Sequence, residues 1–192
     1  MVACLAALGL LLLGPAASAQ EPRDGLHVDA VVEYYDVPGG TFSEVVAAMN
    51  QMRVQGPGAP LSQGLTRYHI RPEWVARASG GSCRPGAVKV FVDIVVTLPR
   101  WDGVEDRPDD ERARWGEIER AIRVHEYRHR DLTIDAADRL LSSIQSLETR
   151  GCTALRQVVA STLSVADGRL REAHAELDRT TPNRLRPGPP GG

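Results

Sequence analysis

The residues of this sequence best suited to chemistry are His125-Glu126-Tyr127-Arg128-His129, an HExxH pattern. In an α-helix, side chains at positions i and i+4 lie on the same face, so both imidazoles can reach one metal ion. Zinc commonly takes such a pair and lowers the pKa of its bound water to about 7, where a neighbouring carboxylate can accept the proton. The motif predicts that His125 and His129 bind Zn²⁺ and that Glu126 is the general base.

The helix around the motif favours a metal site over a pair of core histidines. Apolar residues recur there every three or four positions, which predicts one buried helix face. The members of this stripe are Trp115, Ile118, Ile122, Leu132, Ala136, Leu140, Ile144 and Leu147. His125 and His129 fill its central gap, so both are expected to point inward. Two stacked core imidazoles beside a glutamate, with no metal, would be costly to bury.

The third protein ligand that such a zinc site needs is left open by the sequence. No HExxHxxGxxH extends the motif, and Asp135 lies about 9 Å further along the helix, which is too far. If two long helices form an antiparallel hairpin about Arg150-Gly151, the motif faces the stretch that holds His174 and Asp178. We favour His174 as the third ligand, with Asp178 as the alternative.

Three segments are predicted to be strands because they alternate or are rich in β-branched residues: 26–37, 65–78 and 87–98. Pro72 interrupts the second, which marks an edge strand, and Pro99 is expected to end the third. Strands come first and helices second along the chain. This order predicts an α+β fold with a small antiparallel sheet.

Three helices are predicted, and the two long ones are expected to pack on the sheet. Thr41, with Glu44 three residues later, predicts a capping box and a short helix that runs to about Met52. Two long helices follow, at roughly 110–148 and 153–177. We expect the sheet to pack on the long HExxH helix and on the second, antiparallel C-terminal helix, in a zincin-like arrangement.

The ends of the chain are expected to lie outside the domain. Residues 5–13 form an apolar run too short to cross a membrane, and Ala17-Ser18-Ala19 matches a signal-peptidase site. We therefore predict a signal peptide over residues 1–19 and a single domain over 20–181. The last segment, 182–192, has four Pro and three Gly, and we expect it to be disordered.

Two cysteines remain after the predicted cleavage, Cys83 and Cys152. An even pair in an exported protein predicts one disulfide, which would tie the middle of the chain to a turn near its C-terminal third. Two thiolate metal ligands are the alternative, which an oxidising compartment disfavours.

Composition and charge narrow the class of protein. With 42% hydrophobic and 25% charged residues, the chain is an ordinary globular sequence rather than a disordered one. Its net charge of −2 argues against a nucleic-acid partner. We expect a periplasmic or secreted monomer that has no membrane association after cleavage and that acts on a peptide or protein substrate.

A family resemblance adds to this interpretation. The residues that carry it are Tyr35-Asp36-Val37 with Gly39, Leu65-Thr66, Cys83, Thr97-Leu98-Pro99-Arg100-Trp101, Trp115, the HExxH motif, Cys152, and Asp178 with Thr181. Over roughly residues 33–181 the chain resembles the DUF922 family of bacterial domains of unknown function. The resemblance implies a secreted zinc-dependent protease.

The chain departs from the pattern of this family at two places. Family members usually read HExGH, whereas Arg128 stands at the glycine position here. They also tend to end in Thr-x-His-Gly, whereas Thr181 is followed here by Pro182-Asn183-Arg184. A family histidine near the end of the domain therefore has no counterpart in this sequence.

Three functional hypotheses follow from these observations. The first is an exported zinc metallopeptidase in which strand 87–98 lies along the cleft and pairs with an extended substrate. The second is a zincin-like envelope protein with a binding or structural role, which catalyses little because its third zinc ligand is lost. The third is a metal-free scaffold stabilised by the disulfide.

Overall fold

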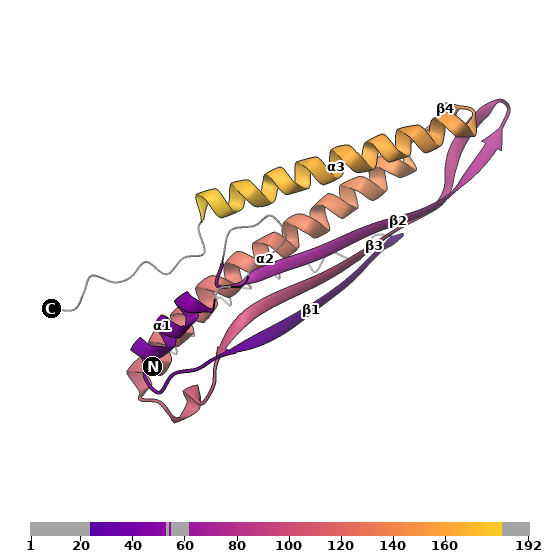
Figure 1. Ribbon diagram of the computed structural model, residues 1–192. Helices are drawn as coiled ribbons and strands as arrows, with labels where there is room; N and C mark the ends of the chain where they lie inside the picture. The colour runs from indigo at the N-terminus through magenta and orange to yellow at the C-terminus, as the bar shows by residue number, and fades with distance from the viewer. Residues whose placement is uncertain (1–23, 53, 55–61, 182–192) are drawn as a thin grey trace, which may run out of the picture.

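The computed structural model describes residues 24–52, 54 and 62–181 (Figure 1). The predicted signal peptide, the predicted C-terminal tail and most of the loop before residue 63 lie outside these ranges. Within them, none of the helices is sufficiently long and apolar to span a membrane.

The sheet has three long strands in the order β1-β3-β2, formed by β1 (Leu26–Val37), β2 (Leu65–Ser79) and β3 (Ser82–Trp101). A fourth strand, β4 (Thr149–Arg150), pairs with the start of β3 and was not predicted. The fold is α+β, as predicted.

The prediction of an antiparallel sheet is wrong for one of the two long pairs. β2 and β3 are antiparallel, but β1 and β3 are parallel. The chain reverses direction between β1 and β2 and again between β2 and β3, so that β3, inserted between the other two, runs with β1. Side-chain alternation determines which face of a strand is buried but carries no information on the direction of its neighbour.

β3 shows the alternation that the sequence predicts. The side chains of its inner face are all buried: Val88, Val90, Val92, Ile94, Val96 and Leu98. The strand extends past Pro99, contrary to expectation. β2 contributes no partner beyond Thr97, which faces Leu65, so the missing N–H of Pro99 disrupts no ladder on that side. Pro72 lies in edge strand β2, as predicted.

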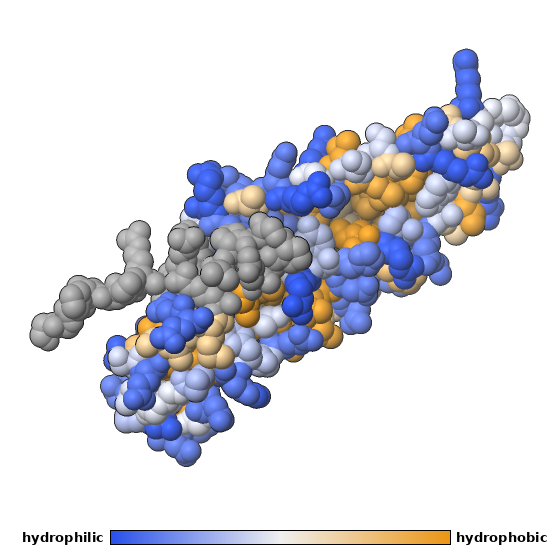
Figure 2. All heavy atoms as spheres, viewed as in Figure 1, coloured by the Kyte–Doolittle hydropathy of each residue, from blue (hydrophilic) through white to orange (hydrophobic). Residues whose placement is uncertain are grey.

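Two long helices cover the inner face of the sheet (Figure 1): α2 (Asp109–Gln145) and α3 (Cys152–Thr180), which form an antiparallel hairpin. The buried stripe of α2 differs from the predicted one at Thr133 and Ala137, which are buried in place of their half-buried neighbours Leu132 and Ala136. Apolar residues gather between α3 and the sheet on the face shown in Figure 2.

The shorter helical segments lie at the end of the molecule opposite to β4 (Figure 1). Helix α1 (Phe42–Gln51) begins with the predicted capping box: Thr41 Oγ1 accepts from the Glu44 N–H, and the Glu44 carboxylate accepts from the Thr41 N–H. A 3₁₀ turn, η1 (Val104–Asp106), precedes α2.

A disulfide joins Cys83 to Cys152, as predicted. It connects the start of β3 to the first residue of α3, at the end of the molecule where β4 pairs with β3. The bond therefore fixes the helical hairpin to the sheet across a sequence separation of 69 residues.

Candidate metal centre

The HExxH segment lies in the middle of α2 and faces the last turns of α3. Nε2 of His125 and Nε2 of His129 are 3.0 Å apart. Oδ1 of Asp178 lies 3.2 Å from the first and 3.1 Å from the second. These three side chains form the one group in the described part of the chain whose ligand atoms converge closely enough to hold a metal ion.

The chemistry of this group suits a metal ion. Both imidazoles are buried, while the Asp178 side chain is 37% exposed, so the group has one side open to solvent. Two ring nitrogens and one carboxylate oxygen direct lone pairs at a common point, and a cation there would compensate for burying them. The residues present therefore fit a bound divalent metal.

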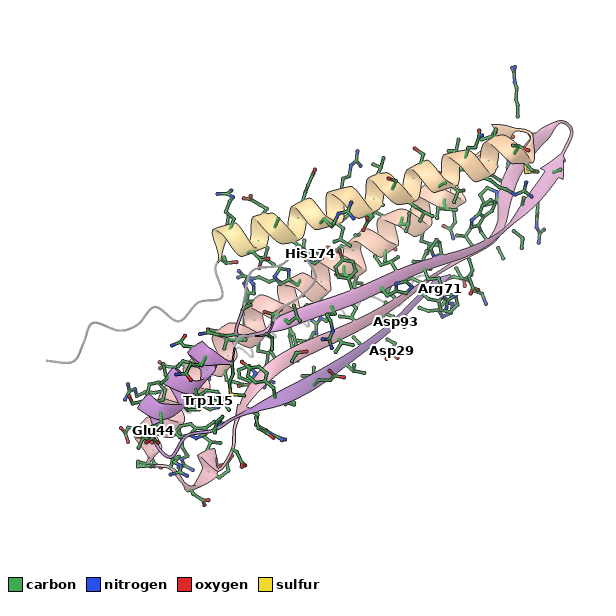
Figure 3. The ribbon with its side chains drawn as sticks, in the orientation of Figure 1. Asp29, Glu44, Arg71, Asp93, Trp115 and His174 are labelled. Carbon is green, nitrogen blue, oxygen red and sulfur yellow. A yellow bond between two sulfur atoms is a disulfide. The ribbon has the colours of Figure 1, made fainter. Side chains whose placement is uncertain are left out.

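His174, the third ligand that the sequence favoured, does not join this group. Its Nδ1 lies 2.7 Å from Nδ1 of His129, on the far side of that ring from the converging Nε2 atoms. Figure 3 shows His174 between α3 and α2. Asp178, the alternative ligand, occupies the third position instead.

The centre of the helical hairpin also differs from the one that the sequence predicted. The sequence predicted a hairpin centred between Arg150 and Gly151. In the structure His125 contacts Asp178 and His129 contacts His174, so the midpoint of both pairs lies one residue later. Partners on α3 shift by two positions as a result. Such a shift turns a different side chain toward the motif, because two residues span more than half a helical turn.

Hydrogen bonds behind the two metal-facing histidines favour the tautomers that a metal requires. Oγ1 of Thr133 donates to the His129 carbonyl at 2.9 Å, so toward Nε2 of His174, 3.4 Å away, it can act only as an acceptor. This favours a proton on Nε2 of His174, and hence a proton on Nδ1 of His129 in the 2.7 Å contact between the two Nδ1 atoms. Nδ1 of His125 lies 3.4 Å from Oγ1 of Thr181. Both Nε2 atoms keep their lone pairs for the metal.

Burial keeps these imidazoles neutral. Desolvation lowers the pKa of His125 and of His129, and the nearby Asp178 carboxylate opposes that effect at each. Burial, with a smaller contribution from His129, lowers the pKa of His174 to about 4. Neutral rings at pH 7 are the form that binds a metal.

Glu126 is buried and is held by the first residues of β2. Its Oε2 lies 2.8 Å from Oγ1 of Thr66, which is also 3.0 Å from the Glu126 backbone carbonyl. Gly64 packs so closely on this side chain that an added Cβ would lie 2.8 Å from Glu126 Cγ and Oε1. Neither Gly64 nor Thr66 was predicted to belong to the site, since a strand-entry glycine or threonine carries no functional signal by itself.

The strand beside the site is β2 rather than β3. Thr66 contacts Glu126, and Tyr68 stacks on His174 with ring centroids 5.0 Å apart. Strand 87–98, which we expected along the cleft, is part of the central strand β3 and is paired on both sides. It therefore has no free edge for a substrate, and that expectation is wrong.

Comparison with known proteins identifies one family. The model of a family described as "Bacterial protein of unknown function (DUF922)" matches residues 32–184, most of the chain. No curated protein matches, and no solved structure does.

Proposed function

The chain belongs to the DUF922 family, and we propose that it is an exported zinc metallopeptidase. The observation that carries this proposal is the convergence of His125 Nε2, His129 Nε2 and Asp178 Oδ1 at the HExxH motif, whose Glu126 side chain is buried. The HExxH helix, packed under a sheet whose edge strand borders the site, supports a zincin-like arrangement.

Zinc is the metal that we assign to the site. Ligands bonded at 2.0–2.1 Å to a tetrahedral ion lie about 3.3 Å apart, close to the 3.0–3.2 Å between the three donor atoms here. A mixed set of imidazole and carboxylate is characteristic of catalytic zinc sites, which keep a fourth position open. When bound, zinc supplies Lewis-acid polarisation and a water of lowered pKa.

Glu126 is the general base in this proposal. Its carboxylate takes a proton from the attacking water and later delivers it to the leaving amine. Thr66 donates a hydrogen bond to one carboxylate oxygen, and Gly64 leaves room for the side chain, so β2 sets the position of the base. His174 and Thr181 orient the two metal-facing imidazoles.

An extended peptide is the substrate that this geometry supports best. β2 is an edge strand, and its first residues contact both Glu126 and His174. A substrate that adds to this edge by main-chain hydrogen bonds would pass directly beside the base. Among the described residues no strand pairs with the outer edge of β2, and we assign to this edge the substrate pairing that the sequence had assigned to strand 87–98.

The proposed location is the periplasm or the extracellular medium. The signal-peptide pattern of residues 1–19 supports export, and the Cys83–Cys152 disulfide supports an oxidising compartment. An exported form should begin at Gln20, which N-terminal sequencing of the protein from a cell envelope or culture medium would establish.

The alternative, a zincin-like envelope protein with little or no catalysis, assumed that the third zinc ligand was lost. Asp178 offers a third donor, so the main argument for that alternative weakens. The hypothesis of a metal-free scaffold likewise gives no explanation for the convergence of three ligand atoms.

The proposal is tested by purifying the processed chain without a histidine tag and measuring metal content and peptide hydrolysis. We expect one zinc per chain, activity that a chelator removes, and loss of activity with retention of zinc in Glu126→Gln. Folded protein that binds no zinc overturns the metal assignment. Equal activity in wild type and Glu126→Gln overturns the role of the base.

A further inference from the structure

The opposite edge of the sheet, β1, has the features of an interaction surface. Among the described residues, β1 pairs only with β3, so its outer side carries backbone groups with no strand beside them (Figure 1). Large apolar side chains on this strand are exposed: Val28 by 42%, Val31 by 45%, Val32 by 39% and Tyr34 by 46%. Exposed apolar residues on a free strand edge favour pairing with another strand.

β1 carries acidic side chains but lacks the other features that protect free edges. It contains no Lys, Arg or Pro, and its register with β3 is unbroken from Leu26 to Val37. The other edge strand, β2, carries Pro72, several arginines and a register shift between Trp74 and Ala76. Lysine, proline and bulges are the usual protection against edge pairing, so β1 is the edge left open to it.

The backbone of β1 shows which residues are available. The Gly25 carbonyl accepts from the Val90 N–H at 2.7 Å, so odd-numbered residues of β1 direct their backbone groups toward β3. Even-numbered residues, among them Val28, Ala30 and Val32, therefore direct N–H and C=O toward the free edge. A partner strand would pair with these residues.

We propose that β1 pairs antiparallel with β1 of a second copy of this chain, about a two-fold axis at Ala30. Ala30 then faces itself, and Val28 faces Val32 of the other copy in hydrogen-bonded pairs. The result is a continuous sheet with six long strands, three from each copy. It leaves β2 and the metal centre free, since β3 separates them from the interface. This proposed dimer differs from the monomer expected from the sequence.

The charges of β1 select this register. An axis at Asp29 or Glu33 places identical carboxylates opposite each other, and an axis at Val31 places Asp29 opposite Glu33; like charges in such positions are destabilising. An axis at Ala30 avoids these contacts and places His27 opposite Glu33 of the second copy, twice by symmetry. With the axis at Ala30, residues 26–34 of one copy pair with residues 26–34 of the other. An axis at Val28 would shorten this paired segment. An axis at Val32 places no histidine opposite a carboxylate.

Two double variants at the same exposed positions test the proposal in the full processed chain. Val28→Lys with Val32→Lys brings like charges together across the axis, whereas Val28→Glu with Val32→Lys brings opposite charges together. Sedimentation equilibrium should give twice the monomer mass for wild type and for the Glu/Lys variant, and the monomer mass for the Lys/Lys variant. A monomeric wild type, or equal masses for the two variants, overturns the proposal.

Amide hydrogen exchange of the wild type gives a test that needs no variant. The N–H groups of Val28, Ala30 and Val32 should be protected at high protein concentration and should exchange faster on dilution. Odd-numbered amides of β1 serve as an internal control, since β3 protects them in both states. Exchange of the even-numbered amides that does not depend on concentration contradicts the dimer.

Discussion

The side chains at the metal centre have two different roles. His125, His129 and Asp178 supply the converging donor atoms, whereas His174 and Thr181 contact the histidine rings from behind. These roles predict different losses of zinc affinity for substitutions that appear equivalent in the sequence.

Asp178→Ala should abolish stoichiometric zinc binding, because it removes a donor atom from the site. His174→Phe keeps a ring to stack on Tyr68 but removes the acceptor for His129, so zinc affinity should fall by only about 10–100-fold. Competition with a chromophoric chelator measures both. A larger loss for His174→Phe than for Asp178→Ala would restore His174 as the third ligand.

Thr66→Val should lower kcat by about 10-fold with zinc content unchanged, because the buried Glu126 carboxylate loses a charge-assisted hydrogen bond worth roughly 1.5–3 kcal/mol at most. Thr66→Ser keeps the hydroxyl and is the matched control. Steady-state hydrolysis of a peptide by the three proteins decides the point. If valine and serine behave alike, Thr66 does not position the base.

The sequence predicts residues with strong chemical signatures well and their supporting residues poorly. HExxH specifies its own geometry, because i and i+4 always share a helix face. The predicted hairpin placed His174 and Asp178 near the motif but did not decide between them, because an error of one residue in its centre moves each partner on α3 by two positions. Thr66 and Gly64 act only through tertiary contacts with α2, about which local sequence carries no information.

At the scale of elements, periodicity predicted the position of every long strand and helix, and the capping box fixed the start of α1. Strand direction and order were not accessible in the same way. The parallel β1–β3 pair results from the position of β3 between β1 and β2, which no pattern within the strands indicates.

The disulfide belongs to this scale, because it joins the start of β3 to the start of α3. Replacing Cys83 and Cys152 together by serine should lower the free energy of unfolding by about 2–4 kcal/mol, mainly by freeing the unfolded chain. Urea unfolding of the double variant, compared with oxidised wild type, measures this. An unchanged midpoint would show that the bond contributes nothing to holding the hairpin on the sheet.

For the whole molecule, the buried His125 and His129 and the half-buried His174 predict how the stability of the metal-free protein depends on pH. In the folded protein the pKa values of these histidines lie below the ordinary value of 6.5, at about 4 for His174. Between pH 6.5 and about 4 the unfolded chain therefore binds more protons than the folded protein. Stability should therefore fall as pH drops from about 6.5 to 4.

Urea unfolding in the presence of a chelator, at several pH values, measures this dependence. His174→Phe should remove part of the slope, roughly 1–2 kcal/mol over the interval, a figure reduced because His174 is partly exposed to solvent. A variant with the slope of the wild type would show that His174 does not carry it.

The most direct test of the account is an anomalous difference map at the zinc absorption edge, from crystals of the processed protein purified without a tag. We predict one peak per chain, within bonding distance of His125 Nε2, His129 Nε2 and Asp178 Oδ1. A peak on other side chains, or no peak in protein supplied with zinc, would contradict the metal centre and the hydrolytic function built on it.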